Sequence, residues 1–292
     1  MIKEKPPYPF DVIATALALS PRAEAVLNES KKLADTFNAK LRLIHIGEKN
    51  NEKERKLTEM IKRAGIKNGS NNIIWKSGDV VESILNVCKT EKVDLLVLGA
   101  IQKESLFKYY MASVARKLCR KAKCSLMLIT EPSNNGQNFN HIVVNGVKHI
   151  KTPSTVETAI YFSDKAKAQA LTLIGELNTK NVIQHDDNKS SVRALNKERH
   201  KTILLESDRL NELTTTYPHK YSCTIEQKYI FGKIGHSIGQ FAETVRADLL
   251  VVNSPSKKLR LIDRIFPHDI EYILGDMPCN LLIVHTRNKE QQ

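Results

Sequence analysis

The sequence predicts an α/β protein of two tandem domains, each built on a five-stranded parallel sheet with helices on both faces. Three observations predict this fold class. Apolar, strand-like runs alternate with helical segments along all 292 residues. The strand-like runs are continuously apolar, as in parallel strands that are buried on both faces. The second half also repeats residues of the first, so the same fold is expected twice.

The repeat consists of identical residues at a constant spacing. Gly78, Ser83, Ile84, Asp94, Leu95, Leu96 and Val97 recur 154 positions later as Gly232, Ser237, Ile238, Asp248, Leu249, Leu250 and Val251. Further matches have a spacing of 155 between Cys124 and Cys279 and of 130 between Leu41 and Leu171. A repeat of this length indicates a duplicated domain. The change from 130 to 154 indicates an insertion of about 24 residues in the second copy.

The first half contains five predicted strands separated by four predicted helices. Ser20 and Pro21 predict a helix start, with serine as the N-cap and proline at the first position. Asp79 predicts the N-cap of a later helix. The predicted strands are 11–17, 41–46, 72–75, 93–98 and 124–129, and the predicted helices are 20–37, 53–64, 79–90 and 106–122.

The second half repeats this order after a polar, turn-rich segment, 132–140, which we expect to be a linker between domains 1–131 and 141–292. The polar stretch 178–200 is the insertion, expected to be a mobile surface loop with a helix near 191–195 or beyond. The predicted strands are 142–147, 171–177, 223–230, 249–252 and 280–285, and the other predicted helices are 152–168, 235–246 and 269–274.

Composition limits the class of protein. No run approaches the ~20 apolar residues of a membrane-spanning helix, and the N-terminus lacks the apolar core of a signal peptide, so a cytoplasmic protein is expected. The five cysteines form no C-x-x-C pair, which argues against a zinc site or a disulfide framework. We therefore expect cysteines in the core, and no metal.

The net charge of +13 is the compositional outlier. Basic residues gather at 116–123 and 257–264 among leucines and isoleucines at helical spacing, which is typical of the solvated face of an amphipathic helix. No nucleic-acid motif accompanies them, so nucleic-acid binding is not expected. A protein partner, such as a membrane transporter, docking on these basic helices is left open.

Five segments carry a resemblance to a known family. They are 78–84, 93–99 and 123–129 in the first half, and 247–252 and 277–284 in the second. In this order, twice, they resemble the universal stress protein family, and the chain is identified as a tandem member. The resemblance implies two Rossmann-like domains of the adenine nucleotide alpha hydrolase-like type. It also implies that the domains pack as an internal pseudo-dimer through their last strands, 124–129 and 279–284, and whole chains could pair further as a homodimer.

The resemblance also implies a candidate nucleotide site in the first half. ATP-binding members have an Asp at the end of the first strand and a Gly-x-x-Gly-x9-Gly-Ser/Thr loop after the fourth, because glycines let backbone amides reach phosphates. Here Gly99 and Ser113 hold the first and last loop positions, whereas Gln102 and Ala112 replace the other glycines. Ala18 replaces the Asp. Lys103 and Lys108 could still attract an anion.

The second half departs further from that pattern. Asn253 and Ser256 replace the first two glycines, and Pro267-His268 replace the Gly-Ser. Aligning Thr152-Pro153 with Ser20-Pro21 places Ile150 at the Asp position. A nucleotide, ATP or another adenine nucleotide, is therefore expected in the first half if anywhere.

No catalytic residues stand out. His45 and the glycine pattern from Gly232 to Gly239 are expected to have structural roles. The favoured hypothesis is a non-enzymatic stress-response or regulatory protein that binds a small ligand or a protein partner. The alternatives are an adenine-nucleotide switch acting through the first domain and an enzyme of the related nucleotide-hydrolase-like fold group.

Overall fold

A computed structural model describes residues 5–66, 73–100, 106–178, 189–215, 217–233, 235–255 and 266–287. The elements of the first half are β1 (Val12–Ala16), α1 (Ala23–Phe37), β2 (Lys40–Ile46), α2 (Asn51–Arg63), β3 (Ile73–Lys76), α3 (Val80–Thr90), β4 (Leu95–Gly99), α4 (Leu106–Lys121) and β5 (Ser125–Ile129). Those of the second half are β6 (His141–Asn145), α5 (Thr152–Ala166), β7 (Ala170–Asn178), α6 (Lys189–Thr214), β8 (Thr224–Gly232), α7 (His236–Thr244), β9 (Leu249–Asn253), α8 (Phe266–Gly275) and β10 (Asn280–Val284).

The described strands form one continuous sheet in the order β3-β2-β1-β4-β5-β10-β9-β6-β7-β8. Within each half all neighbouring strands are parallel, and the halves meet where β5 and β10 pair antiparallel. The α/β class and the parallel strands are confirmed. The two five-stranded sheets are, however, joined into one, because pairing the last strands removes two exposed sheet edges.

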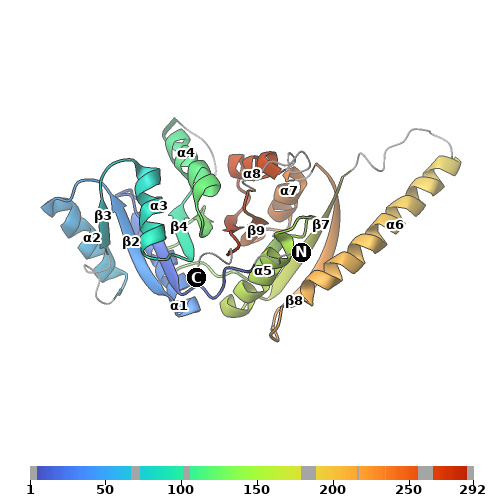
Figure 1. The fold of residues 1–292 in the computed structure, drawn as a ribbon, viewed down its shortest axis with the longest axis horizontal. Helices are drawn as coiled ribbons and strands as arrows, with labels where there is room; N and C mark the ends of the chain where they lie inside the picture. Colours follow the sequence, from blue (N-terminus) through green and yellow to red (C-terminus); the bar gives the residue numbers. More distant parts are fainter. Residues whose placement is uncertain are drawn as a thin grey trace.

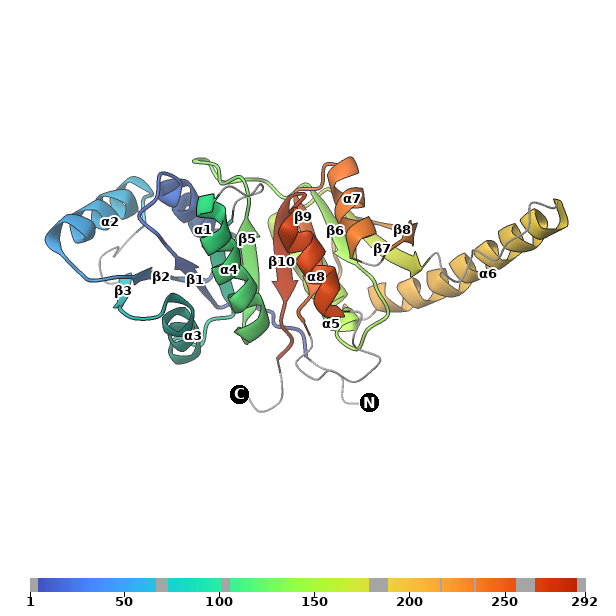
Figure 2. The same cartoon turned by 90° about the horizontal axis from the view of Figure 1, so that it is seen from above.

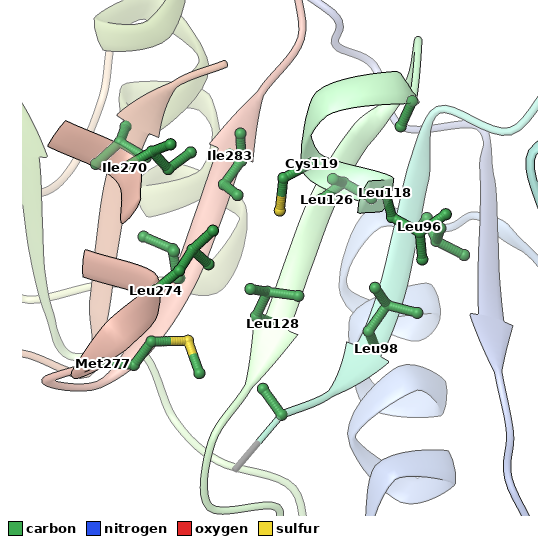
Figure 3. Close-up of a cluster of buried hydrophobic side chains, with 14 of the residues drawn as sticks. Leu96, Leu98, Leu118, Cys119, Leu126, Leu128, Ile270, Leu274, Met277 and Ile283 are labelled. Atoms are coloured by element: carbon green, nitrogen blue, oxygen red, sulfur yellow. The ribbon is translucent and has the colours of Figure 1, made fainter. Parts of the chain in front are cut away.

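Helices cover both faces of this sheet (Figure 1). On one face, α3, α4, α7 and α8 bury Ile84, Leu118, Ile238 and Ile273 in a single cluster that spans both halves. Figure 3 shows part of this cluster, with Leu118 of α4 and Leu274 of α8 on either side of Leu128 and Ile283. On the other face, α1, α5 and α6 contribute Leu33, Ile160 and Leu210 to a second cluster. The core therefore continues across the boundary between the halves.

The junction of the halves has a local two-fold relation. Met127 of β5 is paired with Leu282 of β10, and these two residues are 155 positions apart, as the repeat requires. Ser125 Oγ accepts a hydrogen bond of 3.2 Å from the His285 backbone N–H, and the equivalent Asn280 Oδ1 accepts one of 3.0 Å from Thr130. The predicted pairing of these two strands is confirmed.

The repeated aspartates have a structural role. Asp94 Oδ2 accepts hydrogen bonds of 2.9 Å from the backbone N–H groups of Asp11 and Val12, where β1 begins. Asp248 Oδ2 does the same for Asn140 and His141 at the start of β6, at 2.8 and 2.9 Å. Each carboxylate fixes the amino end of the neighbouring first strand, which accounts for its position in both copies.

Two predictions about helices are corrected. Helix α1 begins at Ala23, with Arg22 as its N-cap and no side-chain cap, because Ser20 lies in the preceding turn, where its carbonyl accepts from Ala23 N–H at 3.0 Å. The helix expected near 191–195 or beyond, within a mobile loop at 178–200, is the 26-residue α6, so residues 189–200 are helical and not a loop. Residues 179–188 lie outside the described residues.

Candidate functional site

The candidate site lies at the carboxyl ends of β1 and β4. These strands are neighbours, but the chain continues from β1 outward to β2 and from β4 outward to β5. In parallel α/β sheets ligands bind outside such a reversal of strand order. Here Ala18 is exposed, and Ala16 and Gly99 are partly exposed. The strand ends of the first half are thus accessible to solvent.

The structure brings together some of the predicted site residues. Ala18 and Gly99 follow or end the adjacent strands β1 and β4. Gln102 and Lys103 lie outside the described residues. Ala112 and Ser113 lie in α4, as does Lys108, but their side chains are also outside the description.

Gly99 is required for packing. A Cβ atom at this position would lie 2.9 Å from Cγ2 of Val26 in α1, closer than carbon atoms approach one another. The glycine therefore allows α1 to lie against the end of β4. This reason for a glycine is independent of phosphate binding, so Gly99 alone does not indicate a nucleotide.

Arg22 is a cation at this site that the sequence prediction missed. Its Nη1 donates a hydrogen bond of 3.3 Å to the Ala100 carbonyl, so the guanidinium spans the gap between the loops after β1 and β4. The residue was overlooked because Ser20-Pro21 was interpreted as the helix start. Its position directly before the helical pattern that begins at Ala23 is the signal that could have identified it.

The equivalent site of the second half is filled by polar side chains. Asn253, the counterpart of Gly99, accepts a 2.5 Å hydrogen bond from the Thr155 hydroxyl and donates one of 3.0 Å to Thr152 Oγ1. Asn145 at the end of β6 is buried, and its Oδ1 accepts from the Val147 backbone N–H at 2.9 Å. Because these groups bond one another, the space at the strand ends is occupied.

Lys151 closes the second site further. It is the N-cap of α5, in the place that Arg22 has in α1, and its Nζ donates to the carbonyls of Ser254 and Pro255 at 3.1 Å each and to Ser254 Oγ at 2.9 Å. Strands β1 and β6, and helices α1 and α5, begin 129 residues apart. The counterpart of Ala18 is therefore Val147, which is buried, and the alignment that assigned Ile150 to this position is wrong.

The other motifs have structural partners. Glu176 Oε1 accepts from the backbone N–H groups of Gly235 and Ile238, at 2.9 and 3.2 Å, so a carboxylate occupies the N-terminal end of α7 where the glycine pattern could have held a phosphate. His45 is buried, its Nδ1 lies 2.9 Å from the Leu17 carbonyl, and its ring packs edge-on against Trp75. His45 and the glycine pattern therefore have the structural roles that were expected.

A surface groove of about 200 Å³ lies between α7 and α8. It exists because Gly235 and Gly239 stand where the first half has Val81 and Leu85, at the repeat spacing of 154. Glu243, Asp276 and Tyr272 are among its lining residues. The sequence prediction did not find this groove, since glycines in a helix were interpreted only as a helix start.

The cysteines are poorly suited to redox chemistry. All five are buried. Desolvation raises the pKa of the Cys279 thiol to about 12 and also raises the pKa of Cys223. A hydrogen bond to Cys88, followed by desolvation, raises the pKa of Cys124 well above its ordinary value. These three groups are protonated thiols at neutral pH, whereas reactive cysteines are thiolates.

Two further types of site are absent from the described part of the chain. It contains no group of three or more His, Cys, Asp or Glu residues arranged to hold a metal ion. It also contains no helix with the length and apolar character needed to cross a bilayer.

Comparisons with known proteins agree with this fold. Residues 47–130 match the model of the universal stress protein family. No curated protein sequence matches the chain. A universal stress protein structure from Archaeoglobus fulgidus superposes with a TM-score of 0.60 and 15% identity, covering 96% of this chain and 97% of that one. The structure of a functionally unknown protein from Pseudomonas aeruginosa superposes with a TM-score of 0.61 and 15% identity, covering 95% of this chain and 93% of that one.

At such low identity the solved structures establish the fold alone, and the family model matches only the first half. That model supports the same assignment as the motifs at 78–84, 93–99 and 123–129. The sheet order shows that β6 to β10 repeat the arrangement of β1 to β5. Residues 47–130 therefore match the universal stress protein family, and both halves of the chain have the fold of that family's solved structures.

Proposed function

We propose that the chain is a non-enzymatic regulatory protein in which the first half binds a small ligand and the second half is a closed scaffold. One observation carries this proposal: the strand ends of the two halves differ in exposure. Ala18 is exposed in the first half, whereas its counterpart Val147 and the nearby Asn253 are 6% and 8% exposed. Duplication preserved the sheet, and only one copy kept accessible strand ends.

The ligand class that we propose is an adenine nucleotide. Arg22 supplies a guanidinium between the two loops, and guanidinium groups bind phosphate oxygens through paired hydrogen bonds. Ser113 retains the hydroxyl position of the family loop, and Lys103 adds charge nearby in sequence. The substitutions Gln102 and Ala112 put side chains where the loop has glycines, so weak binding is expected.

Calorimetry with ATP and ADP tests the proposal, together with mass spectrometry of small molecules released from the purified protein. Arg22→Ala should weaken binding about tenfold, because a hydrogen bond to a charged group contributes about 1.5–3 kcal/mol. Lys92→Ala, which removes an exposed cation at the opposite ends of the strands, is the matched control. Ala18→Asp should tighten binding by restoring the family's carboxylate, and Leu19→Asp should not.

The absence of any co-purifying nucleotide, together with no heat from millimolar ATP or ADP, would remove the ligand proposal. The alternative would then be a protein partner on the exposed basic residues Lys117, Arg120 and Lys123. Nucleotide turnover that Arg22→Ala abolishes would instead favour an enzyme of the related fold group.

A further inference from the structure

The two ends of the sheet differ in length. The strand β3 at one end has only 4 residues, whereas β8 at the other end has 9. Over its whole length β8 pairs with β7, and no other strand among the described residues pairs with it. Short terminal strands protect a sheet from adding another chain, and long ones invite it. The β8 edge is therefore the side of the sheet suited to strand addition.

The direction of one hydrogen bond fixes which β8 residues face this free edge. The Thr224 backbone N–H donates to the Gln169 carbonyl on the β7 side, at 3.2 Å. Backbone groups of successive strand residues point in opposite directions within the sheet. The N–H and C=O groups of Ile225, Gln227 and Tyr229 therefore point away from β7, toward the edge.

The side chains of β8 divide between two faces. The Gln227 amide donates to Asn211 of α6 at 2.6 Å, and Arg199 of α6 lies over the Phe231 ring at 4.5 Å, so these side chains face α6. Glu226 and Lys228 lie on the opposite face and are 54% and 56% exposed. They are 3.7 Å apart, but ion pairs this exposed contribute little, so they are free to exchange partners.

We propose that a second copy of this chain adds to the β8 edge as an antiparallel strand, with a two-fold axis at Gln227. In this register Ile225, Gln227 and Tyr229 bond to Tyr229, Gln227 and Ile225 of the second copy. Glu226 lies opposite Lys228 of the second copy, and Lys228 lies opposite its Glu226. These are non-hydrogen-bonded positions, at which facing side chains come closest.

The neighbouring registers conflict with the charges. A two-fold axis at position 226 places Glu226 opposite Glu226 of the second copy, and an axis at position 228 places Lys228 opposite Lys228. Like charges directly opposite one another destabilise a strand pair. If the axis lies between two residues, the edge-facing backbone groups of one copy lie opposite residues of the other copy whose backbone groups already bond to its β7. No ladder of hydrogen bonds can then form. Charge complementarity thus selects the register centred on Gln227.

Helix α6, which packs on β7 and β8, also carries exposed apolar residues. Figure 2 shows α6 extending past β8 at the end of the sheet. Leu204 and Leu205 of α6 are 53% and 64% exposed. A second copy on the β8 edge would place its own α6 on the same face of the sheet. The layout would repeat that of β5 and β10, where antiparallel strands are flanked by α4 and α8.

Sedimentation equilibrium of the full chain over the micromolar range tests this proposal by charge exchange. The wild type is expected to dimerise. Glu226→Lys and Lys228→Glu each place like charges opposite one another at both symmetric positions, and each should weaken dimerisation by about tenfold or more. The double variant E226K/K228E restores opposite charges and should recover the dimer.

A backbone variant provides an independent measurement. Gln227→Pro removes an N–H that faces the free edge and leaves the ladder to β7 intact, so the monomer should fold and the dimer should be lost. Gln227→Thr is the matched control and should still dimerise. Circular dichroism confirms folding of each variant. A monomeric wild type, a dimer that survives both charge reversals and Gln227→Pro, or a double variant without recovery would each overturn the proposal.

Discussion

At the level of single residues, the two halves differ where the first helix of each half packs against the end of its fourth strand. Where α1 meets the end of β4, Gly99 lies against Val26. The counterparts in the second half, at spacings of 154 and 129, are Asn253 and Thr155, which hydrogen-bond one another at 2.5 Å. One pair leaves the strand ends accessible and the other fills them.

The Gly99→Ala variant tests the packing role of this glycine. Its new methyl group would lie 2.9 Å from Val26 Cγ2, so the free energy of unfolding should fall by about 1–3 kcal/mol, as expected for overpacking. Val26→Ala removes the obstructing atoms. In urea unfolding, the double variant should be more stable than the sum of the two single effects predicts. Additive effects would contradict the contact.

The buried Cys279 thiol should make the free energy of unfolding fall at alkaline pH. Its pKa is raised from 9.0 to about 12 by desolvation, so the unfolded chain loses this proton at lower pH than the folded chain does. The stabilisation is complete below pH 9.0 and is lost as the pH rises toward 12, by about 1.4 kcal/mol per pH unit. Urea unfolding of Cys279→Ala should show a smaller loss over that range. An unchanged slope would mean that the thiol is accessible to water in the folded state.

At the level of elements, strands were predicted well and helix boundaries less well. The strands β4, β5, β9 and β10 are continuous apolar runs, and burial on both faces makes such runs unambiguous. The start of α1 was misplaced because Ser20-Pro21 is a strong local signal that tertiary packing of Ala23 and Val26 overrides. A helix was expected near 191–195 or beyond, but the full length of α6 could not be predicted, because an exposed helix lacks a complete apolar stripe. The filled second site was not predictable, since it depends on contacts between residues about 100 positions apart.

The linker 132–140 is held against α1 by a buried carboxylate. Glu29 is 1% exposed, and it accepts hydrogen bonds from the backbone N–H groups of Ser133 at 2.9 Å and of Gln137 at 2.9 and 3.0 Å. Lys32 adds a 2.8 Å bond to Asn138. A segment that was expected to be a simple connection is therefore packed on the first half.

Glu29→Ala should release this linker. The variant leaves backbone donors without their acceptor, so limited proteolysis should cut within 132–140 faster than in the wild type. Lys31→Ala, which removes a partly exposed residue of the same helix whose Nζ bonds to Asp35 at 2.6 Å, is the control and should leave the rate unchanged. Equal cleavage rates in Glu29→Ala and the wild type would show that Glu29 does not hold the linker.

At the level of the whole molecule, the halves are joined by more than the linker. Strands β5 and β10 pair, α4 packs on α8, and α1 contacts α5. On the last of these contacts Phe37 of α1 packs edge-on against Phe162 of α5, with ring centroids 5.1 Å apart. The sheet and the clusters on both of its faces cross the boundary, so the two halves share one core in addition to the covalent connection.

A chain cut at the linker should therefore stay intact under native conditions. After a protease recognition site is placed within 132–140 and cleaved, the two fragments should elute together in size-exclusion chromatography and separate only in denaturant. The free energy of unfolding should become concentration-dependent, because association of the fragments replaces folding of one chain. Asn280→Ala removes the acceptor of the Thr130 backbone N–H, which is then buried without a hydrogen bond. The dissociation constant of the fragments should therefore rise about tenfold. Fragments that separate on cleavage would show that the strand pairing of β5 with β10 depends on the connection.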